Sequence, residues 1–217
     1  DERFIFLCKG TLETLKKLGW KPDIIHCNDW QTGLIPAYLK TVYRDDPFFK
    51  KTKTIYTIHN LAYQGIFPKE SFNKTGLPKE IFTPDGVEFY GKFNFMKAGI
   101  VYADIVNTVS EKYAQEIRSK EEFGCGLEKL LEKRKKDLYG IVNGVDYSVW
   151  NPATDSLIPE KYNVNTLPKK AENKKALLHK FGLKYNENTP VIGIISRLAD
   201  QKGFDLIGDI IPVLMKL

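Results

Sequence analysis

The chain has 217 residues, of which 42% are hydrophobic and 28% are charged. This length and composition suit one large or two modest globular domains and exclude a disordered tail. The net charge of +6 would favour an anionic partner. However, basic and acidic residues alternate in stretches such as EKLLEKRKKD, which is typical of a solvated helix face. We therefore expect no nucleic-acid partner.

The three cysteines, Cys8, Cys27 and Cys125, lie far apart and lack the spacing of a zinc site or a disulfide framework. We expect no metal and a reducing, cytoplasmic environment. No apolar run reaches the roughly 18 residues of a membrane span, so no membrane partner is expected. Because the chain begins at Asp1 without a methionine, we expect it to be part of a longer gene product.

Predicted helices and strands alternate along the first part of the chain. Helical spacing of apolar residues ends at Gly19, and the helix beginning near Gln31 tolerates Pro36 in its first turns. A helix starting at Ser110 has that serine as its N-cap. In chain order we predict a helix over 6–19, a strand over 22–29, a helix over 31–44, a strand over 52–60, a helix over 93–103, a strand over 104–109, helices over 110–119 and 127–137, and a strand from 139.

Residues 151–168 are rich in Pro, Asn and Asp and predict a surface connection. After it, a helix over 171–183, a strand over 190–196 and a helix over 203–217 restart the alternation. Alternation of this kind predicts open, doubly wound parallel sheets buried on both faces, which is an α/β fold. We expect a first domain over residues 1–138, and a connection followed by the start of a second domain over 139–217.

Polar residues follow the predicted strands, namely Asn28, Asp29, His59, Asn60, Asn143, Asp146 and Arg197. In a parallel sheet these positions share the edge at which α/β proteins bind ligands. Each residue also has an ordinary explanation. His59 could make a hydrogen bond near a strand end, Asp29 could cap the helix near Gln31, and Asn143 could belong to a turn with Gly144.

The segment IHNLAYQG places His59, Asn60, Tyr63 and Gln64 before or beside a glycine turn, where donors and acceptors can meet a ligand rich in hydroxyl groups. Arg197 and Lys202 flank a loop that leads from a strand into a helix. A guanidinium, an ammonium and a helix N-terminus together suit a diphosphate, although two solvated surface charges are the ordinary alternative. The fingerprints of dinucleotide oxidoreductases and P-loop ATPases are absent.

Four long motifs, HCNDWQTGLIPAYL, YTIHNLAYQG, GIVNGVDYSVWNPATD and ISRLADQKGFDL, occur in the order seen in bacterial glycogen synthases and plant starch synthases. The chain therefore resembles the glycogen/starch synthase family over almost its whole length. The resemblance implies a GT-B type fold with two Rossmann-like halves, of which the second is truncated here. It also implies a retaining glucosyltransferase that needs no cofactor and would lie in a plastid if the protein came from a plant.

The family's functional residues carry over by motif. The resemblance implies that His59 contacts the transferred glucose, that Asp29 lies near the reaction centre and that Asn143 lies beside the sugar. Arg197 and Lys202 would bind the donor diphosphate. The implied partners are a nucleotide sugar, with ADP-glucose favoured over UDP-glucose, and an α-1,4-glucan acceptor such as glycogen or starch.

One departure from the family is Glu111 after Ser110, where proline is common; this affects a helix start. A Lys-Gly-Gly loop and a glutamate-bearing loop of the family are absent, so we expect this partial chain to be inactive by itself. Alternatives are a glycosyltransferase with a different acceptor, against which IHNLAYQG argues, and a noncatalytic glucan-binding fragment.

Overall fold

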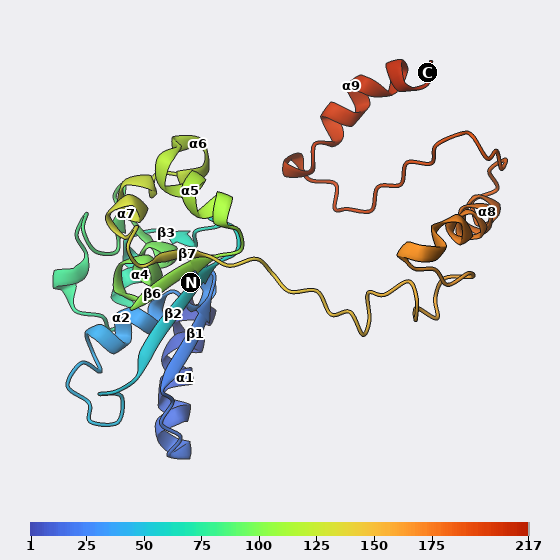
Figure 1. Ribbon diagram of the computed structural model, residues 1–217. Helices are drawn as coiled ribbons and strands as arrows, with labels where there is room; N and C mark the ends of the chain where they lie inside the picture. The colour runs from blue at the N-terminus through green and yellow to red at the C-terminus, as the bar shows by residue number, and fades with distance from the viewer. Residues whose placement is uncertain (217) are drawn as a thin grey trace. The chain divides into compact units, whose positions relative to one another are not determined.

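The computed structural model describes residues 1–216. The chain forms two compact units, Asp1–Gly144 and Val145–Leu217, and each is described by itself (Figure 1). The first unit includes a strand that pairs up to Gly140.

A four-stranded parallel sheet organises the first unit (Figure 1). Its strands, in the spatial order β1-β2-β6-β7, are β1 (Ile24–Asn28), β2 (Lys53–Ile58), β6 (Ile105–Thr108) and β7 (Leu138–Gly140). The register aligns Asn28 with Thr57 and Thr57 with Asn107. Isoleucine, valine and threonine dominate these strands, because branched side chains suit a pleated surface. The α/β fold with a parallel sheet is thus confirmed.

Helices connect the strands, as the alternation predicted. They are α1 (Glu2–Leu18), the 3-10 turn η1 (Trp30–Thr32), α2 (Leu34–Lys40), α4 (Phe95–Tyr102), α5 (Glu111–Ser119), α6 (Glu121–Gly124) and α7 (Glu128–Lys133). Gly19 ends α1 in the left-handed conformation with φ 65°. The Ser110 side chain accepts the Tyr113 N–H and caps α5 as expected.

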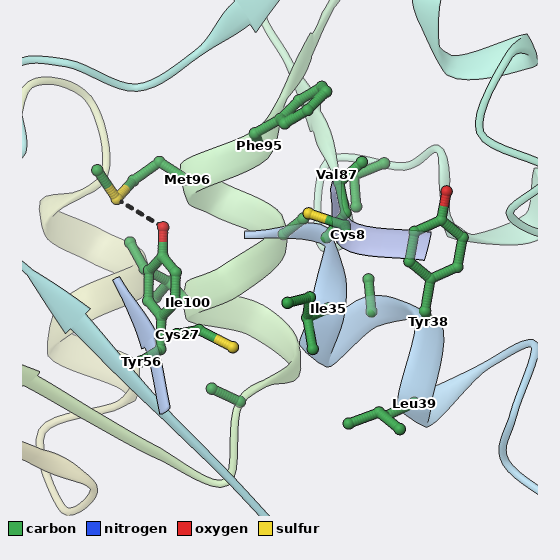
Figure 2. Close-up of a cluster of buried hydrophobic side chains, with 14 of the residues drawn as sticks. Cys8, Cys27, Ile35, Tyr38, Leu39, Tyr56, Val87, Phe95, Met96 and Ile100 are labelled. Carbon is green, nitrogen blue, oxygen red and sulfur yellow. Dashed lines mark hydrogen bonds between the residues drawn. The ribbon is translucent and has the colours of Figure 1, made fainter. Parts of the chain in front are cut away.

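The core of the first unit is formed largely by side chains of α1, α2 and α4 together with the strands β1 and β2, and part of it is drawn in Figure 2. Tyr56 of β2 and Met96 of α4 are fully buried there, and the tyrosine hydroxyl donates to the methionine sulfur at 3.0 Å. Each large side chain buried in this way contributes roughly 1.5–3 kcal/mol. The labelled members in Figure 2 are Cys8, Cys27, Ile35, Tyr38, Leu39, Tyr56, Val87, Phe95, Met96 and Ile100.

The interior strand β2 is buried on both faces, as expected, because its successive residues Tyr56, Thr57 and Ile58 are each at most 4% exposed. The strand β1 differs, with Cys27 1% exposed and Ile24 55% exposed. The reason is that β1 is the edge strand of the described sheet. The single helix expected over 31–44 is divided into η1 and the short α2, because Gly33 lies at the junction and Pro36 lacks the N–H that a longer preceding helix would need.

A small antiparallel sheet was not predicted. It has the order β3-β5-β4, from β3 (Ile66–Phe67), β5 (Lys92–Asn94) and β4 (Glu88–Phe89). Strands of two or three residues are too short to show an alternating pattern. The short elements α3 (Glu70–Asn73) and η2 (Lys79–Ile81) lie between β3 and β4.

The second unit contains η3 (Val164–Lys169), α8 (Lys170–Lys180), η4 (Asp200–Lys202) and α9 (Phe204–Leu214). The strand expected over 190–196 is not formed, and Ile192 and Ile195 there are 73% and 103% exposed. A strand needs a hydrogen-bonded neighbour, and residues 145–216 supply none. As for membranes, no helix within residues 1–216 has both the length and the apolar character needed to cross one.

Candidate functional site

The carboxyl ends of β1 and β2 bring Asn28, Asp29 and His59 together. The His59 backbone N–H donates to Asp29 Oδ1 at 2.9 Å, and the His59 ring Nε2 lies 3.0 Å from Asn28 Oδ1. With Nε2–H donating to that amide oxygen, a neutral imidazole keeps its Nδ1 lone pair for another donor. Because the His59 side chain is exposed, a ligand hydroxyl can reach it.

Asp29 occupies the N-cap position of η1, as the capping interpretation expected, but its side chain makes no capping hydrogen bond. Its carboxylate is turned to His59 instead. The Asp29 backbone has φ 55° and ψ −178°, a region that strains a residue other than glycine by about 1–3 kcal/mol. The Asp29 N–H donates to Thr57 O at 2.9 Å, so Asp29 is hydrogen-bonded both to β2 and to the residue that follows it, His59.

The segment after His59 is fixed by its own turn and by α5. Asn60 Oδ1 accepts the Ala62 N–H at 3.0 Å, and the Leu61 N–H donates to the Tyr113 hydroxyl at 3.1 Å. Burial is the largest cause that raises the pKa of Tyr113, and the charge of Asp29 contributes in the same direction. Tyr113 therefore stays a neutral hydroxyl beside the site. Tyr63 is 55% exposed at the same turn.

Gln64 lies inside the protein rather than on the open edge. Its side chain is buried, its Nε2 donates to Cys125 O at 2.9 Å, and its Oε1 accepts from Asn94 Nδ2 at 2.6 Å. Its backbone O also accepts the Met96 N–H at the start of α4. The structure thus gives Gln64 a role in attaching the loop, which its place in the motif did not indicate.

Trp30 and Gly65 connect the two motif loops, and sequence reasoning missed this contact. Gly65 has φ 62°, and a Cβ built on it would lie 2.2 Å from Trp30 Cε3. Only glycine allows the backbone to lie this close to the indole ring. The Trp30 ring also meets Phe4 edge-on, with 4.6 Å between ring centroids. The available signals were the aromatic residue in HCNDW and the glycine in YQG, but no local pattern pairs them.

Asn143 follows β7 in the first unit and is exposed. The Ile141 N–H donates to Thr108 O at 2.8 Å, which keeps the chain against β6 until shortly before Asn143. Because β7 is parallel to the other strands, Asn143 leaves the sheet at the same edge as Asp29 and His59. The topology thus places Asn143 at the edge where the prediction expected it.

Arg197 and Lys202 belong to the second unit, where they lie on either side of a turn. The Lys202 N–H donates to Ala199 O at 2.8 Å, and Gly203 with φ 67° precedes α9. Both cationic side chains are exposed and make no hydrogen bond or ion pair within the described chain. Two unpaired cations before the N-terminus of an 11-residue helix suit a multiply charged anion.

The part of the chain that the structure describes holds no cluster of three or more His, Cys, Asp or Glu side chains arranged for a metal ion.

The chain is an α/β protein whose parallel sheet carries amide, carboxylate and imidazole groups at its carboxyl edge, which is the edge at which open α/β sheets bind ligands. The family model of the starch synthase catalytic domain matches residues 1–133. Since this is more than half of the chain, the chain belongs to the starch synthase catalytic domain family.

Glycogen synthase of Thermotoga petrophila is 55% identical over 214 residues, which cover 99% of this chain and 44% of that protein. Glycogen synthase of Desulforudis audaxviator is 53% identical over 216 residues, which cover 100% of this chain and 43% of that protein. The catalytic domain of starch synthase IV from Arabidopsis thaliana, bound to ADP and acarbose, matches with a TM-score of 0.89 and 36% identity, covering 99% of this chain and 44% of that one. The chain thus spans less than half the length of these relatives.

Proposed function

We propose that the full-length protein containing this chain transfers glucose from a nucleotide-glucose, with ADP-glucose as the donor, to the non-reducing end of an α-1,4-glucan with retention of configuration. The observation that carries the proposal is the exposed His59, fixed by Asp29 at the open edge of the sheet. Membership of the starch synthase family supports it. So do the names of the bacterial relatives and the ADP and acarbose bound by the plant enzyme.

The first unit is assigned to the acceptor and to the transferred glucose. His59 would contact a glucose hydroxyl through its imidazole, and Asn143 and Asn60 would offer amide groups to the same sugar. Tyr63, with an exposed side chain, would bind at the rim. Asp29 would act mainly by fixing the His59 backbone, since its carboxylate already accepts that N–H. Gln64 would position the loop, because its side chain is used inside the protein.

The second unit is assigned to the nucleotide sugar. In the transfer, the bond between the anomeric carbon and the donor phosphate oxygen breaks, and negative charge grows on the leaving diphosphate. Arg197 and Lys202 would stabilise that charge. The acceptor hydroxyl oxygen forms the new bond to the anomeric carbon on the same face, and its proton passes to the leaving phosphate. The nucleoside diphosphate then departs with the electron pair of the broken bond and the proton of the acceptor hydroxyl.

The test is incorporation of radiolabelled glucose into glycogen by the full-length protein, with ADP-glucose and UDP-glucose compared side by side. Arg197→Ala and Lys202→Ala should each weaken donor turnover while leaving glycogen binding nearly unchanged. Lys184→Ala is the matched control, because this exposed lysine lies in the same unit without a polar partner among residues 1–216. Parental turnover in both cation variants would mean that Arg197 and Lys202 are surface charges.

No incorporation from either donor by a folded full-length protein would reject the proposed transferase. Glycogen binding that persisted without transfer would instead favour a noncatalytic glucan-binding role.

A further inference from the structure

Tyr90 occupies a backbone position that does not suit a tyrosine. It forms the two-residue turn between β4 and β5 together with Gly91, and the two residues have φ 49° and 80°. Positive φ at both positions defines a type I′ hairpin turn, for which Asn-Gly is strongly preferred. A bulky side chain at positive φ is an outlier, and this one is 81% exposed. Neither turn geometry nor burial therefore explains the aromatic ring.

The exposed ring is nevertheless held in place. Phe89 meets it edge-on, with 4.6 Å between centroids and 80° between ring planes. Gly126 lies behind both rings: a Cβ on it would be 2.9 Å from Phe89 Cζ and 3.3 Å from Tyr90 Cε2. A glycine here lets the backbone support the two rings directly. Tyr90 thus presents to solvent an aromatic ring that packs against Phe89 and lies close to Gly126.

A cavity of about 360 Å³ adjoins this surface, since Phe89 and Gly126 also line it. Lys97 also lines the cavity and is only 7% exposed. Its Nζ donates to Pro84 O and to Glu88 O, at 2.5 Å each. These two hydrogen bonds fix the loop before β4. The remaining polar lining includes Asp85, Lys129 and Lys133. Lys133 and Asp85 are 3.3 Å apart and largely exposed, so their spare donors and acceptors remain available to a ligand.

An aromatic face beside charged donors and acceptors is the chemistry that recognises a sugar, because pyranose C–H groups stack on the ring while hydroxyl groups are hydrogen-bonded. We propose that Tyr90 and the adjoining cavity form an additional binding site for the α-1,4-glucan acceptor, separate from the residues that carry out transfer. This inference rests on the proposed function, which supplies the glucan. Such a site would hold a long chain near the enzyme and raise the effective concentration of its free end.

The experiment compares Tyr90→Asn and Tyr90→Phe in the full-length protein by affinity electrophoresis in gels containing glycogen and by titration with maltoheptaose. Asparagine suits the turn, so Tyr90→Asn removes the ring without disturbing the hairpin, and its melting temperature should equal or exceed that of the parent. We expect Tyr90→Asn to bind glycogen roughly three- to tenfold more weakly, as befits one lost aromatic stacking contact. Tyr90→Phe should keep most of the affinity.

Transfer to a saturating short acceptor separates this inference from the proposed function. Tyr90→Asn should retain parental kcat with that acceptor and show a raised KM only for glycogen. A parental protein that binds glycogen but transfers nothing would refute the transferase, while a difference between the Tyr90 variants would still support the site. Equal glycogen affinity and equal KM in the parent and in Tyr90→Asn would overturn the inference, whatever the transfer activity.

Discussion

Asp29 Oδ1 accepts the backbone N–H of His59 at 2.9 Å, so the carboxylate that follows β1 fixes the residue that follows β2. A second hydrogen bond links the same two segments: the Asp29 N–H donates to Thr57 O of β2 at 2.9 Å. These two bonds offset the strain of Asp29 at φ 55°. The imidazole is therefore presented from a backbone that is already ordered before any ligand arrives, which is what electrostatic catalysis requires.

His59→Ala in the full-length protein should lower turnover far more than stability. The ring is exposed and has one hydrogen bond, to Asn28, so its loss should change the free energy of unfolding by less than about 1 kcal/mol. Loss of a contact made in the transition state should raise the barrier on the order of 2 to 4 kcal/mol. Glucose transfer and a melting curve measure the two effects. His179→Ala, an exposed histidine of α8, should leave both unchanged, and a folded His59→Ala protein with parental turnover would remove His59 from the reaction.

Gly65→Ala should destabilise the first unit and disturb the site at the same time. Gly65 has φ 62°, and the new Cβ would lie 2.2 Å from the Trp30 ring. Gly19→Ala is the control, because Gly19 has φ 65° and a Cβ added to it would meet no other heavy atom within 4 Å. Both variants acquire about 1–2 kcal/mol of backbone strain, but only Gly65→Ala displaces Trp30, which should add roughly 1–3 kcal/mol. Urea unfolding midpoints test the difference, and equal destabilisation would show that the Trp30 contact is unimportant.

Asp104 should make stability depend on acid pH. Burial by itself would raise the pKa of this carboxyl group, but hydrogen bonds from Lys40 and Thr54 outweigh burial and leave the pKa below its ordinary value. A depressed pKa in the folded state gives a contribution to stability that is complete above the unfolded pKa, near 4. That contribution is lost as the pH falls through the folded pKa.

Asp104→Asn should thus be less stable than the parent at pH 7, and the difference should shrink as the pH is lowered from about 4. Urea unfolding at a series of pH values measures it. Asp85→Asn removes a carboxylate whose side chain is 93% exposed, so it should show little difference at any pH. If the difference in stability between the parent and Asp104→Asn stayed constant into strong acid, the depressed pKa of Asp104 would be contradicted.

Periodicity and end signals predicted the main elements of the first unit. Ser110 and Gly19 act within a few residues of the helix ends that they define, so their effect is visible in the sequence. Hydrogen bonds between residues far apart in the sequence cannot be predicted in this way. The Leu61 N–H meets the hydroxyl of Tyr113, and Gln64 meets Cys125, each more than 50 positions away along the chain. Such contacts depend on how the loops pack, which no local pattern encodes.

The candidate site likewise has features that the sequence could predict and features that it could not. Topology alone places Asp29, His59 and Asn143 at one edge, because residues that follow parallel strands emerge together. Topology could not show that the Asp29 carboxylate accepts the His59 N–H and makes no hydrogen bond to the N–H groups at the start of η1. It also gave no reason to expect Gln64 to be buried. The direction of a side chain at a strained backbone position is decided by tertiary packing.

The chain of residues 1–217, produced without any further sequence, should transfer no glucose although it contains every residue assigned to the reaction. In the second unit, apolar side chains such as Ile192 and Ile195 are exposed, and the segment 190–196 has no strand partner within residues 145–216. Arg197 follows that segment directly, so its guanidinium lacks the fixed geometry that makes a charge catalytic. Hydrogen exchange should show strong protection in β2 and weak protection over 190–196. Incubation with radiolabelled ADP-glucose and glycogen should give no more incorporation than a blank. Robust incorporation, or protection over 190–196 equal to that of β2, would mean that the second unit completes its site by another route, such as association of two copies of the chain.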